Sequence, residues 1–227
     1  MSGVERQVVL ITDVTGDLGG HLVGASLRGG ADRVYACAPH RLMAPSRRVV
    51  PMLLDADDPV SIGRLAETAA DVTVLVTTTT SPTWPPVSVS GGDADALQRH
   101  LARALFPPLR VASALAATLA ANGGGVIACV ESVQAWINLT GAFGVAQAAL
   151  WSAVNALRVE LRPSGVHVLA AIGAFDEGER MSMPAAAETI LAGIADRSNE
   201  VVLDEYTARV RRRLSGRLEQ LYPEVEG

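Results

Sequence analysis

Three carboxylic acids lie directly after predicted strands, where the side chains of a parallel sheet meet at one edge. Glu131 follows the apolar run 125–130, and Asp176 and Glu177 follow the apolar run 166–171. A carboxyl group in a partly apolar pocket has a raised pKa and can transfer protons near neutral pH. These acids are therefore candidate acid/base groups for a redox-neutral reaction, such as an isomerisation, a dehydration or a ring closure.

Other polar and aromatic side chains near these strand ends could bind a small molecule. Ser132 is placed with the acids in the candidate catalytic set, because its hydroxyl could hold a substrate carbonyl. Aromatic side chains would supply the apolar walls that most ligand pockets have. The expected substrate contacts are Trp84, Gln134, Trp136, Asn138, Phe143 and Gln147. The alternative is that the acids are surface loop residues and the aromatic residues belong to the core.

Short Val-rich runs alternate with longer Ala- and Leu-rich helical stretches along the whole chain. Continuous apolar strands are typical of a parallel sheet that is covered on both faces. The pattern predicts one domain, 1–227, with a Rossmann-type α/β fold: a doubly wound parallel seven-stranded sheet flanked by helices. The expected strands are 7–12, 33–38, 49–54, 72–77, 125–130, 166–171 and 201–203. The expected helices are 18–28, 60–69, 93–121, 142–161, 184–195 and 204–219.

The composition excludes several classes of protein. A net charge of −5 argues against a nucleic-acid-binding domain. Two cysteines within buried-strand patterns, with no signal peptide, fit a reducing cytoplasm. The uncharged stretch 132–157 contains polar residues and glycines, so it predicts a packing helix and no membrane span. The four histidines are not spaced as metal ligands.

Six segments, in order and spacing, resemble the short-chain dehydrogenase/reductase family over nearly the whole chain. They are ITDVTGDLGGHLV, LLDADD, VTVLVTTTT, IACVESV, GAFGVAQAALWSAVNALRVEL and GVHVLAAIGAFD. The resemblance implies NAD(P) binding and hydride transfer by a Ser–Tyr–Lys set.

The chain departs from this family's pattern at the glycine-rich turn. Asp13 and Asp17 stand at two of the three glycine positions, whereas Gly19 is kept. Carboxylates at this turn would repel a pyrophosphate, by about 4 kcal/mol for unit charges ~4 Å apart at an effective dielectric of 20. The alternative for Asp17 is that an acid near a helix start caps the helix and complements its dipole. Asp55 matches the family's adenine-contacting aspartate. These four residues are interpreted as remnants of a cofactor site, and no cofactor is expected.

The catalytic set departs as well. Ser132 is retained, but Phe143 stands at the tyrosine position and Gln147 at the lysine position, and the chain contains no lysine. The expectation is a NAD(P)-independent, redox-neutral cyclase, isomerase or dehydratase acting on a small apolar, natural-product-like substrate. One alternative is a catalytically silent partner of an active paralogue. A second alternative is an unusual NAD(P)H-dependent reductase.

The expected partners are a small-molecule substrate and further copies of the chain. Members of this family usually assemble as dimers or tetramers, and the uncharged face of 142–161 suits such an interface. The expected assembly is therefore a cytoplasmic homo-oligomer formed through this helix, without nucleic acid or membrane.

Overall fold

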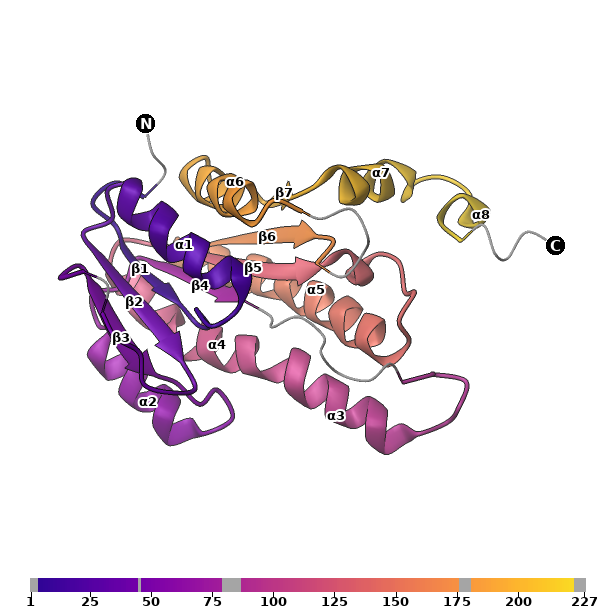
Figure 1. The fold of residues 1–227 in the computed structure, drawn as a ribbon, viewed down its shortest axis with the longest axis horizontal. Helices are drawn as coiled ribbons and strands as arrows, with labels where there is room; N and C mark the ends of the chain where they lie inside the picture. Colours follow the sequence, from indigo (N-terminus) through magenta and orange to yellow (C-terminus); the bar gives the residue numbers. More distant parts are fainter. Residues whose placement is uncertain (1–3, 45, 79–86, 176–180, 223–227) are drawn as a thin grey trace.

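The computed structural model describes residues 4–44, 46–78, 87–175 and 181–222. Its centre is one parallel sheet of seven strands in the order β3-β2-β1-β4-β5-β6-β7 (Figure 1). The strands are β1 (Val8–Ile11), β2 (Arg33–Ala38), β3 (Val49–Leu53), β4 (Val74–Thr78), β5 (Val126–Ser132), β6 (His167–Gly173) and β7 (Glu200–Val202). The predicted fold class is therefore confirmed.

Helices cover both faces of this sheet (Figure 1). They are α1 (Asp17–Arg28), α2 (Pro59–Thr68), α3 (Ala94–Ala104), α4 (Phe106–Ala121), α5 (Ala142–Leu161), α6 (Met183–Ala195), α7 (Glu205–Arg213) and α8 (Leu218–Leu221). Two single-turn 3₁₀ helices, η1 (Val133–Ala135) and η2 (Arg162–Ser164), lie before and after α5.

The alternation of side chains along the strands separates two apolar layers. In β5, Ala128 and Val130 belong to the cluster that contains residues of α1 and α6. Ile127 and Cys129 belong to the opposite cluster, which contains residues of α2, α4 and α5. Both faces of β5 are therefore buried, which explains its unbroken apolar sequence.

The predicted helix 93–121 is wrong in one respect, because it is two helices that meet at Leu105. Pro107 and Pro108 occupy the first turn of α4, where the missing proline N–H groups need no helical acceptor. Prolines in the middle of one continuous helix would instead remove internal hydrogen bonds. The predicted helix 204–219 is likewise divided into α7 and α8, with Gly216 in the intervening turn.

The combined stretch Ala94–Ala121 has the length and apolar composition of a membrane span. Helices that cover the core of a soluble protein satisfy the same criterion, and α3 carries Arg99, His100 and Arg103. Fully buried Leu115 and Leu119 of α4 pack in the cluster beneath it. We therefore interpret α3 and α4 as part of the layer that covers the sheet.

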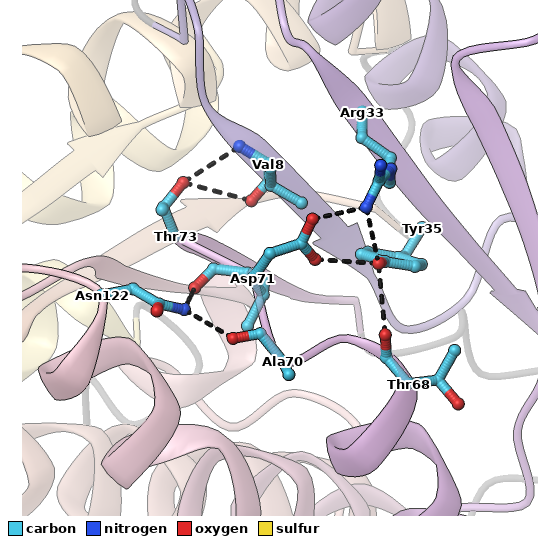
Figure 2. Close-up of polar contacts among 9 residues, drawn as sticks. Val8, Arg33, Tyr35, Thr68, Ala70, Asp71, Thr73 and Asn122 are labelled. Carbon is cyan, nitrogen blue, oxygen red and sulfur yellow. Dashed lines mark hydrogen bonds and ion pairs between the residues drawn. The ribbon is translucent and has the colours of Figure 1, made fainter.

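Polar side chains hold the amino edge of the sheet together (Figure 2). The Tyr35 hydroxyl donates to Asp71 at 2.8 Å, and Arg33 forms an ion pair with the same carboxylate. The Thr73 hydroxyl accepts a hydrogen bond from the Val8 N–H at 3.0 Å. The Asn122 side chain donates to two backbone carbonyls of the turn before β4, both at 2.9 Å. These contacts join β1, β2, β4 and the end of α4 at the edge opposite the strand ends that carry the candidate site.

Candidate functional site

A cavity of about 470 Å³ opens at the carboxyl edge of the sheet. Its wall includes Thr12 and Asp13 after β1, Asp55 after β3, and Thr78 at the end of β4. The chain order reverses between β1 and β4, because β2 and β3 lie on one side of β1 and the later strands lie on the other. Ligands of doubly wound folds bind outside the carboxyl ends of the strands at such a reversal.

Two threonine hydroxyls fix the turn after β1 to β4. The Thr12 hydroxyl accepts a hydrogen bond from the Thr78 N–H at 3.1 Å, and the Thr78 hydroxyl donates to the Asp13 carbonyl at 3.0 Å. A Cβ atom on Gly19 would lie 2.4 Å from the same carbonyl oxygen. The absence of a side chain at Gly19 thus lets α1 pack directly against the turn. The sequence identified Gly19 as part of this turn, but it did not predict a role for the two threonines. Their positions at the ends of two neighbouring strands could have indicated that role.

The two aspartates of this turn have different surroundings, and the position of Asp17 agrees with the alternative that it complements the dipole of α1. One Asp13 carboxylate oxygen accepts hydrogen bonds from the Thr15 N–H at 2.8 Å and the Thr15 hydroxyl at 2.6 Å. Asp17 is exposed in the first turn of α1, where a carboxylate complements the helix dipole. Gly16 caps α1 without a side-chain hydrogen bond, and a Cβ atom there would meet nothing within 4 Å. The amino end of α1 is therefore open.

The Asp55 carboxylate is held at the mouth of the cavity. Its Oδ1 atom accepts a hydrogen bond from the Asp57 N–H at 2.9 Å, and its own N–H donates to the Ser61 hydroxyl at 2.9 Å. These bonds fix the side chain while it lines the cavity.

The start of α5 lies against the end of β5. Gln147 is completely buried, and its Oε1 atom accepts a hydrogen bond from the Ser132 N–H at 2.8 Å. Within the described ranges, the Gln147 Nε2 atom has no hydrogen-bond acceptor. Phe143, one turn earlier, is also buried. The structure therefore brings the three predicted residues Ser132, Phe143 and Gln147 to one junction.

Gln134 and Asn138 shape the loop that leads into α5. The Gln134 Oε1 atom accepts hydrogen bonds from the Leu139 N–H at 2.8 Å and the Thr140 hydroxyl at 3.3 Å. The Asn138 side chain donates to the Gly141 carbonyl at 3.0 Å, and its backbone N–H donates to the Tyr222 hydroxyl at 2.8 Å. Asn138 also lines an open cavity of about 760 Å³ beside this loop. These contacts give both side chains a structural role.

Trp136 is half-buried on the side of this loop that faces α7. The Arg211 guanidinium lies 5.5 Å from the centre of the indole ring, a cation–π geometry. Nε1 of Trp136 has no acceptor in the described part of the chain. The predicted residues Trp84, Asp176 and Glu177 lie outside the described residues.

Glu131 is completely buried, and neither of its carboxyl oxygens has a partner among the described residues. Burial raises the pKa of Glu131 to about 8, with Arg158 lowering it and Glu200 raising it further. Successive strand residues point to opposite faces, so Glu131 shares the face of Cys129 whereas Ser132 faces the other way. The two residues assigned to one catalytic set are therefore directed to different faces of β5.

No protein-family model and no curated protein sequence matches the chain. Solved structures match its fold closely. A short-chain dehydrogenase from Burkholderia cenocepacia, determined in complex with NADP, is 24% identical with a TM-score of 0.89, covering 98% of both chains. A short-chain dehydrogenase from Mycobacterium smegmatis is 20% identical with a TM-score of 0.77, covering 90% of this chain and 94% of that one. The fold is therefore that of short-chain dehydrogenase structures.

A third similar structure is a short-chain oxidoreductase from Pseudomonas aeruginosa described as containing an atypical catalytic centre. It is 18% identical with a TM-score of 0.74, covering 87% of this chain and 95% of that one.

These findings overturn the expectation of a cofactor-independent, redox-neutral enzyme or a silent partner. The chain has the fold of dehydrogenase structures, one of which was determined with NADP. The expectation depended on the replaced tyrosine and lysine positions and on repulsion of a pyrophosphate by Asp13 and Asp17. One carboxylate is instead bonded to Thr15, and the other is exposed in the first turn of α1.

Proposed function

We propose that the chain is an NADP(H)-binding oxidoreductase with an atypical catalytic centre. The observation that carries the proposal is the cavity at the strand reversal between β1 and β4. It occurs in a fold that closely matches a dehydrogenase solved with NADP. This proposal replaces the cofactor independence that we inferred from the sequence.

The residues around the cavity fit a dinucleotide. The open amino end of α1 offers backbone N–H groups and a positive dipole end to a pyrophosphate. Asp55 is held where it can contact a base. The end of β2 carries no acid, and it is followed by exposed Pro39, His40 and Arg41. An arginine near this position accommodates the 2′-phosphate of NADP, which favours NADP over NAD.

The junction of β5 and α5 would receive the nicotinamide half of the cofactor. A reduced nicotinamide supplies a hydride. The Gln147 side chain is fixed by its bond to the Ser132 N–H, and its Nε2 atom is a buried donor to which a ribose hydroxyl could serve as acceptor. Gln147 carries no charge, so unlike a lysine it cannot lower the pKa of a neighbouring acid by charge. Phe143 has no exchangeable side-chain proton, so the Ser132 hydroxyl is the polar group retained to orient a substrate.

A titration with NADPH and NADH tests the proposal. We expect saturable NADPH binding, followed by calorimetry or nucleotide fluorescence. Arg41→Ala should weaken NADPH binding by roughly tenfold, about 1.4 kcal/mol, and leave NADH binding nearly unchanged. Arg64→Ala removes another exposed arginine, on α2, and serves as the matched control. Failure of both nucleotides to bind the wild-type chain would refute the proposal.

We also propose a small-molecule substrate, a cytoplasmic location and a homo-oligomer formed through α5. Ala148 and Ser152 are exposed on the uncharged half of this helix, and Val159 is 74% exposed near its end. Such an apolar surface favours contact with another copy. Light scattering after size-exclusion chromatography measures the mass, and a monomer would contradict this assembly. The single domain predicted over 1–227 likewise stays a prediction.

A further inference from the structure

A second cavity, of about 460 Å³, lies beside the amino end of β6. Its wall is formed by the last turn of α5, the segment that enters β6, and Asn199 before β7. Three basic side chains line it: Arg158, Arg162 and His167. No carboxylate is among its described lining residues. Because β6 begins at His167, this cavity lies at the edge opposite the candidate dinucleotide site.

Arg158 is held in place by three acceptors. Its Nε atom donates to the Val168 carbonyl at 3.1 Å, and its Nη2 atom donates to the Asn199 carbonyl at 2.8 Å. Its Nη1 atom donates to the Asn155 side-chain oxygen. A guanidinium has five N–H donors, so two of them remain for another acceptor. The side chain is thus pre-organised by α5, β6 and the turn before β7.

The charges of Arg158 and Arg162 are not balanced by a nearby carboxylate. Elsewhere in the described chain, arginines such as Arg28, Arg110 and Arg211 form ion pairs with carboxylates. Within the same ranges, no carboxylate lies within 4 Å of Arg158 or Arg162. Two like charges four residues apart on one helix are unfavourable unless an anion compensates them.

Glu131 does not supply that compensation. It is near enough to Arg158 for the arginine to lower its pKa, yet burial keeps that pKa at about 8. At neutral pH the Glu131 carboxyl is therefore mainly protonated and carries little charge. Arg158 consequently remains a net positive group beside the cavity, in a protein whose overall charge is −5.

The basic residues also lie at the carboxyl end of α5, where they stabilise the helix dipole. That role alone requires neither a cavity nor the fixation of Arg158 by carbonyls of two neighbouring segments. The His167 ring is fixed as well, because its Nε2 atom lies 2.8 Å from the Ser198 carbonyl oxygen. Val159 also lines the cavity and is 74% exposed, so it provides an apolar surface beside these polar groups.

We propose that this cavity binds a small organic phosphate monoester. The phosphate would lie between Arg158 and Arg162, because a dianion matches two guanidinium charges and accepts hydrogen bonds from both. The apolar part of the ligand would lie against Val159. A volume of about 460 Å³ is within the range of small-molecule pockets. The proposal does not depend on NADP(H) binding at the opposite edge.

Phenyl phosphate is the test ligand, inorganic phosphate its smaller analogue and phenol its uncharged control. Binding is measured by calorimetry and by the NMR signal of the His167 ring, assigned with His167→Gln. We expect saturable phenyl phosphate binding that shifts this signal, weaker binding of inorganic phosphate, and none of phenol. Arg162→Ala should weaken phenyl phosphate binding by at least roughly tenfold. The exposed position of Arg162 means that this variant should fold.

Arg41→Ala and Arg64→Ala are the controls, and both should bind phenyl phosphate as the wild type does. Binding that is lost in Arg41→Ala but retained in Arg162→Ala would place the phosphate at the carboxyl edge and refute the proposal. Absence of saturable binding, or a His167 signal that does not move, would refute it equally. A wild-type chain that binds phenyl phosphate but does not bind NADPH would contradict only the proposed function.

Discussion

Replacing Glu131 by glutamine should stabilise the protein, and the gain should grow with pH. The wild-type carboxyl has a pKa of about 8 when folded, against 4.5 for an ordinary glutamate. Between these values the unfolded chain has lost a proton that the folded chain keeps. The contribution of Glu131 to stability is therefore fully present below about pH 4.5 and is lost as the pH rises toward 8.

The size of the effect follows from the same two pKa values. One pKa unit corresponds to about 1.4 kcal/mol, so the wild type should lose about 3 kcal/mol through Glu131 between pH 5 and pH 7.5. Glutamine has nearly the same shape and does not ionise, so the variant should not show this loss. The difference in unfolding free energy between the two proteins should thus widen by about 3 kcal/mol over this range.

Urea denaturation at pH 5 and pH 7.5 measures that difference, provided that the slopes agree between variant and wild type. Glu67→Gln, which changes an exposed glutamate on α2, is the matched control and should show a much smaller change. A Glu131→Gln variant whose advantage is equal at both pH values would refute the reasoning. It would mean that the carboxyl ionises in the folded state about as easily as in the unfolded chain.

Four further substitutions test other parts of the structure. Gly19→Ala should destabilise the protein by about 1–3 kcal/mol, because the new Cβ would meet a backbone oxygen at 2.4 Å. Gly20→Ala places its Cβ in open space and should stabilise α1 by up to about 1 kcal/mol. Thermal unfolding compares the two variants, and equal effects would contradict the packing of the turn. Tyr35→Phe should cost about 1 kcal/mol in urea denaturation by removing the 2.8 Å bond to Asp71, and no change would mean that this bond is not formed in solution. Phe143→Tyr supplies an exchangeable proton and should increase the rate of NADPH-dependent carbonyl reduction if proton transfer limits that rate. Steady-state kinetics with a panel of ketones measures the rate. An unchanged rate would mean that a step other than proton transfer is limiting.

The arrangement of the sheet could be predicted because each strand is marked by a short apolar run of consecutive residues. Each apolar run is long enough to be a strand buried on both faces, and strand–helix alternation leaves few topologies for a parallel sheet. The break at Leu105 was missed although Pro107 and Pro108 were visible, because the apolar helical pattern continues across them. A pattern shows which residues are apolar, but it does not show where two helices with the same character separate.

The candidate site was harder to predict, because a sequence shows which side chains are charged but does not show where they point or which groups they contact. Asp13 was expected to repel phosphate, but its carboxylate is bonded to Thr15 two residues later. An aspartate followed at that spacing by a residue with a free N–H is a known turn signal, so this arrangement could have been inferred. The opposite directions of Glu131 and Ser132 also follow from strand alternation alone. The burial of Gln147 between α5 and the end of β5 could not be inferred in this way, because it depends on residues distant in sequence.

The bond between Asn138 and Tyr222 has a consequence for the order in which the protein is made. The loop that leads into α5 is held by a hydroxyl that lies 84 positions later in the chain. During synthesis the strands and α5 can pack as soon as they emerge, but this loop lacks its anchor until α8 has followed them. The loop that leads into α5 therefore reaches its final arrangement only after all seven strands of the described sheet have been synthesised.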